Sequence, residues 1–342
     1  MNGTKQICAT RYDGYLAFQA NCNELEIVYL VSGWHRTSLI SVIVADILLI
    51  LPAVILNLLV IAVVKKHRSL QTVSNILLAC LAVSDLLIGL IMIPCVVGSV
   101  AIVLKCKLVC WFYIVTFQVG YYLAIVSFLT LTLVSLDRYF AISYPYQYQV
   151  QTASGKTVKV VVAATWLISC FVIILSYALQ KMRLPSQFFT VLAPLSIFIS
   201  FTTQICTLRA VRAVRRRDAS TTVRDYNVKS LRPSRKSYMR EKATRVAAFI
   251  LLATICCYLP HAVLTTIRTL RKDIFAFQGI YDWTKTLVIA NSALNPIIYC
   301  MNIREMRSKA FRMICNTRNA RVDSKKDSMF SMAATIKVGN QR

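Results

Sequence analysis

Long apolar runs recur along this chain of 342 residues and leave few options for its fold. A helix needs about 20 apolar residues to cross a hydrocarbon core of about 30 Å, and only helices and closed barrels satisfy every backbone hydrogen bond in lipid. The composition agrees, because 57% of the residues are hydrophobic and 16% are charged. We therefore predict an all-α membrane protein, built as a seven-transmembrane helix bundle. The predicted spans lie near residues 39–64, 73–98, 107–140, 157–180, 184–208, 246–270 and 279–301.

Few polar residues separate the fourth predicted span from the fifth. A single helix over residues 157–208 would be about twice as long as a membrane is thick. Pro185 and its charged neighbours Lys181 and Arg183 favour a turn between the two. The sequence therefore predicts two spans here.

The charges that flank the spans predict the orientation of the chain. Lys65, Lys66 and Arg68 follow the first span, whereas the basic residues of the tail at 1–37 are scattered and matched by acidic ones. Lys and Arg collect on the cytoplasmic side of short loops, so we expect an extracellular N-terminal tail and a cytoplasmic C-terminus. That tail has no apolar core of a signal peptide, and the first helix is expected to act as its own insertion signal. The other predicted divisions are the bundle at 38–301, a short amphipathic cytoplasmic helix 8 at 302–315 and a disordered cytoplasmic tail at 316–342.

The net charge of +26 does not indicate nucleic-acid binding. The basic residues gather in the loop at 209–245 and in the tail after Met301, beside the predicted spans. Such clusters are attracted to the anionic lipid of the inner leaflet. We therefore expect membrane lipid and a cytosolic protein to meet these residues.

Short motifs occur in a fixed order along the spans. Asp137-Arg138-Tyr139 ends the third span and Asn295-Pro296-Ile297-Ile298-Tyr299 ends the last. Ionisable residues at the edge of hydrocarbon are costly unless they are paired or face a cavity, so they indicate function. The other motif positions are Asn57, Leu81-Ala82-Val83-Ser84-Asp85, Trp166, Pro194 and Cys257-Tyr258-Leu259-Pro260. Over residues 39–315 the chain thus resembles a class A, rhodopsin-like G protein-coupled receptor, on the amine, adenosine and melanocortin side of that family.

The resemblance implies a plasma-membrane receptor that activates a heterotrimeric G protein when a ligand binds outside and the sixth helix moves outward. Arrestin and a receptor kinase are the further partners that it implies. Arg138 is expected to carry the signal, because its guanidinium is always charged, and to pair with Asp137 at rest. Pro260 and Pro296 remove helix hydrogen bonds and provide hinges. The switch residues carried over are Asp137, Arg138, Tyr139, Tyr258, Pro260, Asn295, Pro296 and Tyr299.

Asp85 falls in the middle of the second span, where an isolated carboxylate costs several kcal/mol. The resemblance implies a structural sodium ion beside it and no other cofactor. A polar network that only fixes the register of the helices is the alternative. The sodium ligands implied are Asp85, Ser127, Asn291 and Asn295.

Three positions depart from the family pattern. Tyr258 replaces the usual Trp, Arg240 stands where an acidic residue often clasps the third-helix arginine, and Thr202 replaces a tyrosine. The missing clasp suggests raised basal activity. A degenerate receptor that acts as a non-signalling scaffold or heterodimer partner is the alternative function.

The cysteines also depart from the pattern. Most relatives join the third helix to the second extracellular loop, but the connection at 177–188 contains no cysteine. The cysteines predicted outside allow two bridges in three connectivities, and a bridge from the tail to the third helix is preferred. Cys315 is a candidate for lipidation, with a plain thiol as the alternative. The candidates for disulfide bonds are Cys8, Cys22, Cys106 and Cys110.

The ligand pocket is expected between the outer thirds of the helices. Gly120 stands where amine receptors have an Asp, and Ile289 where opsins have a Lys, which disfavours a cationic amine and retinal. Asp46 is predicted to be a counter-charge for a basic ligand group or for Lys285, or else a polar residue facing the cavity. The candidate pocket residues are Gln118, Tyr121, Ala124, Gln187, Tyr258, His261, Thr265, Trp283, Lys285 and Ile289.

Basic residues crowd the predicted outer ends of the helices, against the usual bias. An anionic ligand is one explanation, and side chains that reach the interface are the other. These residues are Lys105, Lys107, Lys181, Arg183, Arg268, Arg271, Lys272 and Lys285.

No metal-ligand spacing and no nucleophile–base arrangement occurs in the sequence, so we do not expect an enzyme. A transporter would use charge in the middle of the membrane and broken helices. Asp85 fits that class, but the sequence has no internal repeat.

Overall fold

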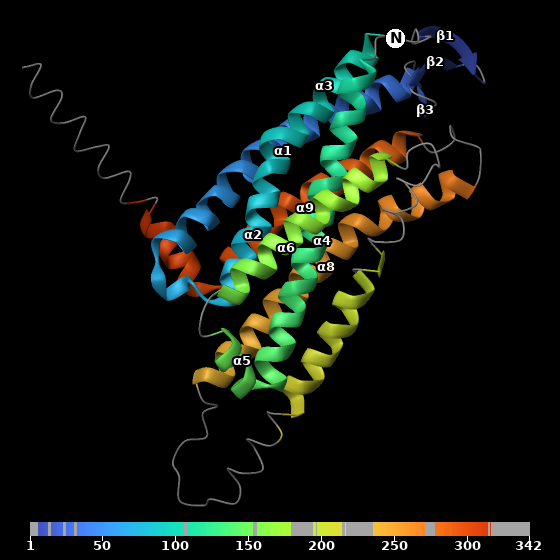
Figure 1. The fold of residues 1–342 in the computed structure, drawn as a ribbon. Coiled ribbons are helices and arrows are strands. Elements are labelled where there is room, and N and C mark those ends of the chain that lie inside the picture. Colours follow the sequence, from blue (N-terminus) through green and yellow to red (C-terminus); the bar gives the residue numbers. More distant parts are fainter. Residues whose placement is uncertain are drawn as a thin grey trace, which may run out of the picture.

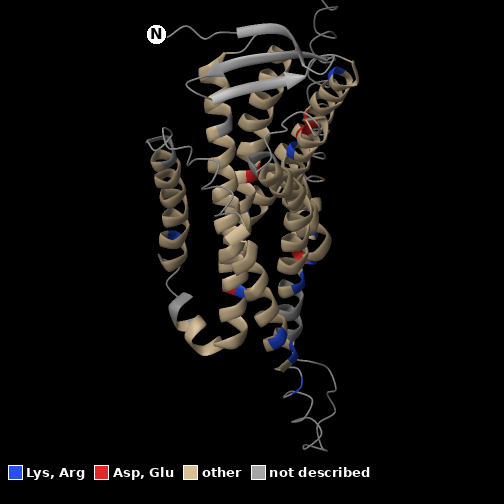
Figure 2. Ribbon diagram, turned by 90° about the vertical axis from the view of Figure 1, so that its right-hand side faces the viewer, with Lys and Arg blue, Asp and Glu red and all other residues tan. Residues whose placement is uncertain are grey.

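A computed structural model gives the fold of the chain (Figure 1). The part of the chain that it describes comprises residues 6–12, 15–22, 25–30, 33–105, 109–152, 156–178, 194–195, 197–213, 216, 235–270, 278–313 and 315. The long helices run beside one another as a bundle, and charged residues are sparse along them (Figure 2). The labelled helices of the described residues are α1 (Gly33–Lys66), α2 (Val73–Leu87), α3 (Ile93–Leu104), α4 (Cys110–Ser143), α5 (Pro145–Thr152), α6 (Lys156–Ala178), α8 (Arg235–Leu270) and α9 (Gln278–Asn302). A further helix covers residues 197–213.

The spanning segments follow from the apolar runs. Five of the described segments are long and apolar enough to cross a membrane. The sixth, α9, passes the same criterion together with the short helix Arg304–Met313, from which it is bent by 105°. The predicted fifth span overlaps the helix at 197–213 and extends outside the described residues. The predicted all-α membrane bundle with a short eighth helix is confirmed.

The second span contains a local irregularity that Pro94 explains. Between α2 and α3 the chain forms a π-helical segment, η2 (Ile88–Met92), and proline stands in the first turn of α3. Proline lacks the backbone N–H of a regular helix and clashes with the preceding turn, and π-bulges are a common way to absorb this disruption. Gly89 within η2 lets α1 approach closely, since a Cβ there would lie 3.0 Å from Val54 Cγ2.

The N-terminal residues form a sheet that the sequence analysis did not predict. Strands β1 (Gln6–Tyr12), β2 (Tyr15–Cys22) and β3 (Leu25–Leu30) pair antiparallel in the order β1-β2-β3. Only two residues separate each strand from the next in the sequence, and Asp13-Gly14 is a sequence typical of tight hairpins. The sheet lies at the end of the bundle where α1 begins (Figure 1). Gly33 starts α1 with φ +57°, a conformation that favours glycine.

Burial follows helical spacing on α1. Ala53, Asn57, Val60 and Val64 are buried, and they recur every three or four residues. The largest apolar cluster joins this stripe to residues of α2, α4, α8, α9 and the helix Arg304–Met313. Met306 of the short helix is fully buried there, which fixes the helix against the bundle. This cluster lies at the end of the bundle where α4 ends, here called the Arg138 end.

Candidate functional site

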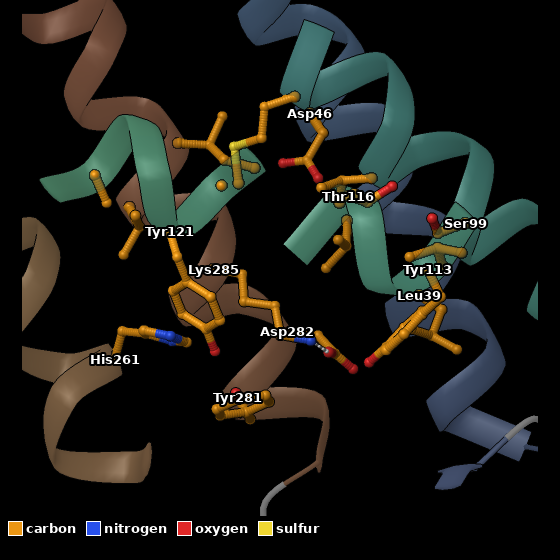
Figure 3. Close-up of a pocket in the computed structure, with 18 of the residues that line it drawn as sticks. Leu39, Asp46, Ser99, Tyr113, Thr116, Tyr121, His261, Tyr281, Asp282 and Lys285 are labelled. Carbon is orange, nitrogen blue, oxygen red and sulfur yellow. Dashed lines mark hydrogen bonds and ion pairs between the residues drawn. The ribbon is translucent and has the colours of Figure 1, made fainter. Parts of the chain in front are cut away.

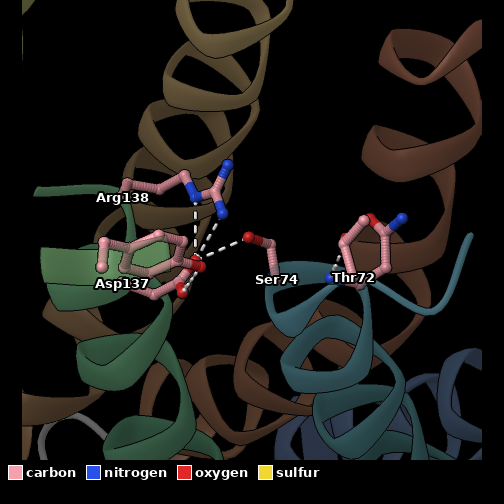
Figure 4. A network of polar contacts seen from close by, with 6 residues as sticks. Thr72, Ser74, Asp137 and Arg138 are labelled. Carbon is pink, nitrogen blue, oxygen red and sulfur yellow. Dashed lines mark hydrogen bonds and ion pairs between the residues drawn. The ribbon is translucent and has the colours of Figure 1, made fainter. Parts of the chain in front are cut away.

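At the Arg138 end, the Asp137 carboxylate is the centre of a polar cluster (Figure 4). Arg138 donates to Asp137 Oδ2 from Nε at 3.0 Å and from Nη2 at 2.5 Å. Ser74 of α2 donates to the same oxygen at 2.6 Å, and the Tyr148 hydroxyl of α5 donates to Oδ1 at 2.6 Å. The predicted pairing of Asp137 with Arg138 is present in this arrangement. Ser74 and Tyr148 were missed, because nothing in their spacing brings α2 and α5 to this carboxylate.

Tyr148 is suited to the role of a permanent donor. Burial, and then the neighbouring Asp137 carboxylate, raise the pKa of Tyr148 above its ordinary value. Its hydroxyl therefore keeps its proton at neutral pH. The third residue of the motif, Tyr139, instead packs its ring against Phe140 and Tyr144.

Of the residues expected to clasp or to support Arg138, Thr202 has a described side chain, and Arg240 and Glu241 do not. The side chains of Arg240 and Glu241 lie outside the described residues, so the missing clasp stays a prediction. Thr202 is described, and its hydroxyl donates to the carbonyl oxygens of Phe198 and Ile199 in its own helix. It therefore does not take the place of a tyrosine that reaches toward the motif.

A buried polar core lies in the middle of the bundle. Asp85 is fully buried, and Asn295 Nδ2 donates to its Oδ2 at 2.9 Å. Asn57 Nδ2 donates to the carbonyl oxygens of Ala53 and Ser292 at 2.8 and 2.9 Å, which joins α1 to α9. Of the four predicted sodium ligands, Asp85 and Asn295 contact one another. The hydroxyl of Ser127 lies 3.0 Å from that of Ser84, and Thr254 donates to Asn291 at 3.4 Å.

The donor set of this core fits a hard cation. Asp85 Oδ1 and Asn295 Oδ1 are buried and have no hydrogen-bond partner among the described groups. Hard cations take oxygen ligands, carboxylate and amide oxygens among them. The residues present therefore match the chemistry of the sodium ion that the sequence analysis implied.

Tyr258 connects this core with a cavity nearer the start of α1. Its ring contacts Phe128 of α4, with the ring centroids 4.6 Å apart. It also lines the cavity, and Pro260 lies two residues further along α8. On α9, Pro296 and Tyr299 are buried, and the Tyr299 hydroxyl has no hydrogen-bond partner in the described part of the chain.

The cavity has a volume of about 100 Å³ and lies between α1, η2, α3, α4, α8 and α9 (Figure 3). Six of the ten predicted pocket residues line it, namely Tyr121, Ala124, Tyr258, His261, Lys285 and Ile289. The sequence analysis did not place Tyr113, Thr116, Tyr281 or Asp282 in the pocket, and all four line it. The signal for Asp282 was its spacing, because positions 282, 285 and 289 share one helix face.

The other predicted pocket residues do not line this cavity. Trp283 is 41% exposed and lies on the outer surface of the bundle, because it is one position round the helix from Asp282. Gln118 and Thr265 are also absent from the wall, and the Thr265 hydroxyl donates to the His261 carbonyl. Gln187 lies outside the described residues.

Three charged side chains, Lys285, Asp282 and Asp46, line the cavity, and two of them form an ion pair. Lys285 Nζ lies 2.8 Å from Asp282 Oδ1, and Gln278 donates to the other oxygen of Asp282 at 3.1 Å. The ammonium also lies 4.6 Å from the centroid of the Tyr281 ring. Asp46 faces the cavity from α1, and only 1% of its surface is exposed. Asp46 thus faces the cavity, as one of its predicted alternatives required. Lys285 forms its ion pair with Asp282 and also attracts Asp46, so the role of Asp46 as a counter-charge stays a prediction.

Of the basic residues predicted at the outer ends, only Lys105 and Lys285 have described side chains. Lys105 is exposed, and Lys285 is the one that has a carboxylate partner. The wall of the cavity therefore offers little support for an anionic ligand.

The cysteines can be placed only in part. Cys110, at the start of α4, is disulfide-bonded. The side chains of Cys8, Cys22 and Cys106 lie outside the described residues, so the preferred connectivity stays a prediction. Cys315 is a free cysteine of intermediate exposure.

Known proteins similar to this chain identify its family. The family described as 7 transmembrane receptor (rhodopsin family) matches residues 56–186 and 178–299. The histamine H2 receptor of Cavia porcellus is 27% identical over 299 residues, with 81% of this chain and 80% of the relative covered. Trace amine-associated receptor 365 of Petromyzon marinus is 27% identical over 320 residues, with 84% and 82% covered.

A further relative is the neuromedin-U receptor 2 of Mus musculus, 26% identical over 334 residues, with 86% of this chain and 80% of the relative covered. These relatives are receptors, and the prediction that the chain is not an enzyme is thereby confirmed. The matched family, the similar relatives and the membrane-length helices agree. The chain belongs to the rhodopsin family of seven-transmembrane, G protein-coupled receptors.

Proposed function

We propose that this receptor converts the binding of an extracellular ligand into activation of a heterotrimeric G protein by an outward movement of α8. The ligand occupies the cavity between α1, α4, α8 and α9, and the G protein meets the Arg138 end. The observation that best supports this proposal is the Asp137 cluster. The Asp137 carboxylate binds the permanently charged guanidinium of Arg138 and also accepts hydrogen bonds from α2 and α5. Such a group can exchange one set of partners for another without leaving the protein surface.

The route from cavity to Arg138 passes along α8. Tyr258 lines the cavity and packs against Phe128, so a ligand that displaces its ring also changes the contact of α8 with α4. Pro260 weakens the helix next to this contact, because it removes a backbone hydrogen bond. A ligand shifts the equilibrium only by its difference in affinity for the two arrangements. We expect this difference in ligand affinity to arise at Tyr258, because its ring contacts both the cavity and α4.

The polar core around Asp85 supports a second part of this proposal, in which a bound ion stabilises one arrangement of the helices. We infer that a sodium ion is held by Asp85 with help from Ser127, Asn291 and Asn295, in the arrangement that does not signal. When bound, the ion supplies the positive charge that a buried carboxylate otherwise lacks. The unpartnered oxygens of Asp85 and Asn295 support this assignment.

The receptor's place in the cell is part of the same proposal. We place the chain in the plasma membrane with the N-terminal sheet outside and the helix Arg304–Met313 inside. Arrestin and a receptor kinase act on the segment after residue 315. Cys315 follows that short helix as a free thiol, where an acyl chain would reach the bilayer.

The test is second-messenger signalling, cyclic AMP and calcium together, in cells that express the receptor and its variants at matched surface levels. Asp137→Asn weakens the hold on Arg138 and should raise ligand-free signalling above that of the unmodified receptor. Adding Arg138→Ala to that variant should return the signal to the background of untransfected cells. Arg36→Ala, an exposed arginine at the start of α1, is the matched control and should change nothing.

A non-signalling scaffold predicts a different pattern. If Asp137→Asn and the double variant both stay at background while each reaches the surface, the proposed coupling is wrong. Association with another receptor at the surface would then be the function to examine.

A further inference from the structure

Gln204 is a buried polar residue on the helix at 197–213. Only 4% of its surface is exposed, and it shares the buried side of that helix with Ser200 and Thr207, which recur every three or four positions. Its Nε2 donates to the main-chain carbonyl oxygen of Thr244 on α8 at 3.0 Å. A carbonyl oxygen can only accept, so the nitrogen end of the amide must face α8. This hydrogen bond therefore ties two helices together.

The helix at 197–213, yellow in Figure 1, is also fixed to α4. The hydroxyls of Ser200 and Thr132 lie 3.0 Å apart, and Thr132 belongs to α4. The Thr132 hydroxyl also lies 2.9 Å from the Phe128 carbonyl oxygen, to which it can donate. Through these contacts the helix at 197–213 provides an anchor that joins α8 to α4.

The oxygen of the Gln204 amide indicates that this residue does more than stabilise the bundle. Its Oε1 is buried and has no hydrogen-bond partner within the described ranges. An unsatisfied buried acceptor offsets much of what one hydrogen bond contributes to stability. Methionine, an unbranched apolar residue, would fill a similar space without that cost. The amide is therefore better explained by control over the position of α8.

The place of Thr244 makes this hydrogen bond sensitive to movement of α8. Thr244 lies about 24 Å along α8 from Pro260, at about 1.5 Å of rise for each residue. A change of about 5° in the bend at Pro260 would therefore displace Thr244 by about 2 Å. A hydrogen bond of 3.0 Å is lost at such a displacement, because its energy falls steeply with distance and angle.

We propose that Gln204 is a positioning residue that holds α8 in the arrangement that does not signal. Outward movement of α8 breaks its hydrogen bond to the Thr244 carbonyl, and a bound ligand favours the arrangement in which this bond is broken. The inference rests on the proposed function, since it takes α8 as the helix that moves. Because the acceptor is a main-chain atom, the restraint does not require an acidic residue at the position of Arg240.

Ligand-free second-messenger signalling at matched surface levels is the first readout. Gln204→Met removes the donor and should raise this signal about three- to tenfold, the shift that loss of one hydrogen bond gives to an equilibrium. Its unfolding temperature should stay close to that of the unmodified receptor, because the unsatisfied Oε1 is removed together with the bond. Thr203→Ala is the matched control and should change neither quantity, since the Thr203 hydroxyl donates to the Ile199 carbonyl of its own helix.

Hydrogen–deuterium exchange of the purified full-length receptor, without a G protein, tests the movement itself. In Gln204→Met the main-chain amides of residues 197–213 and of the first half of α8 should exchange faster, because the two helices separate more often. The amides of α1 should keep their exchange rates. Gln204→Asn shortens the side chain by one methylene group and should act in the same direction, so it replaces Gln204→Met if that variant does not fold.

Three results would overturn the assignment. They are unchanged signalling and exchange in folded Gln204→Met, an equal change in Thr203→Ala, and faster exchange throughout the receptor instead of at these two helices. Exchange does not require a G protein, so the two proposals can fail separately. Faster exchange at α8 in Gln204→Met without a signal from any variant refutes only the coupling. Signalling that depends on Arg138 but is unchanged in Gln204→Met refutes only the role of Gln204.

Discussion

Asp137 shows how one carboxylate can join three parts of the chain. It is buried, and it accepts hydrogen bonds from Ser74 on α2, from Tyr148 on α5 and from the adjacent Arg138. A buried charge depends on each of its donors, because the loss of one leaves a lone pair without a partner. The residues that hold Asp137 therefore help to decide how firmly Arg138 is kept in place.

Tyr148→Phe should lower the free energy of unfolding by about 1–3 kcal/mol, the usual cost of a lost hydrogen bond to a charged group. It should also raise ligand-free signalling, because Asp137 then holds Arg138 with one donor fewer. Both effects can be measured by thermal unfolding and by second-messenger assays. Tyr146→Phe is the matched control, since Tyr146 lies on the same helix and is 81% exposed; an equal effect in both variants would contradict the assignment.

The pH dependence of this contact has a definite sign. The pKa of Tyr148 is raised in the folded protein, first by burial and then by Asp137. The stabilisation is therefore fully present below the ordinary tyrosine pKa of about 10 and is lost only as the pH rises through the folded value. Between pH 6 and 9, a range chosen to lie below about 10, the difference between Tyr148→Phe and the unmodified receptor should stay constant.

At the scale of elements, the short helix Arg304–Met313 is fixed by two different kinds of contact. Met306 and Ala310 are buried in the largest apolar cluster. On its polar side Glu305 accepts from Lys309 at 2.8 Å and from Ser69 at 2.9 Å, and Lys309 also contacts the Ser69 hydroxyl. The Glu305 side chain is 45% exposed, so solvent screens this ion pair. Burial should therefore decide whether the helix stays docked.

Met306→Ala should cost about 2–5 kcal/mol of stability, because it leaves a cavity in a packed cluster. Glu305→Gln should cost less than about 1 kcal/mol, as exposed ion pairs do. Thermal unfolding compares the two, and a larger loss in Glu305→Gln would show that polar contacts dock the helix. The hydrogen bond from Lys309, more than any other cause, lowers the pKa of Glu305. The small stabilisation from the Glu305–Lys309 contact is therefore present above the ordinary glutamate pKa. It is lost as the pH falls through the lowered pKa of Glu305 in the folded protein.

At the scale of the whole molecule, a polar core separates two differently packed ends. The largest apolar cluster holds the Arg138 end together, and smaller clusters surround the cavity. Between them, Asp85 and Asn295 are joined across 210 positions of sequence. An element that contacts several helices at once can bias the arrangement of them all.

Sodium should therefore stabilise the whole receptor through this core. Replacing the NaCl in the buffer by N-methylglucamine chloride at equal ionic strength should lower the unfolding temperature of the unmodified receptor. Asp85→Asn should remove that difference, because the amide carries no charge for the ion to balance. Asp46→Asn is the matched control, an acid-to-amide change at the cavity, and should keep the sodium effect. A sodium effect that survives in Asp85→Asn would place the ion elsewhere.

Local patterns were enough to predict the bundle and the positions of its motifs. A span is decided by about 20 neighbouring residues, and the residues of the Asp137-Arg138 pair are adjacent in sequence. The stripe of positions 282, 285 and 289 also follows from helical spacing alone. For the same reason the positions of Tyr258 and Pro260 relative to one another were predictable.

The sequence by itself therefore determined that this chain spans a membrane as a bundle of the rhodopsin type, because hydrophobicity and helical period act over short distances. Only the tertiary structure decided which charges meet. Lys285 forms its ion pair with Asp282, Trp283 is 41% exposed and does not line the cavity, and Ser74 and Tyr148 reach Asp137 from other helices. These outcomes depend on the rotation of each helix about its axis and on which helices adjoin, and packing between segments far apart in sequence sets both.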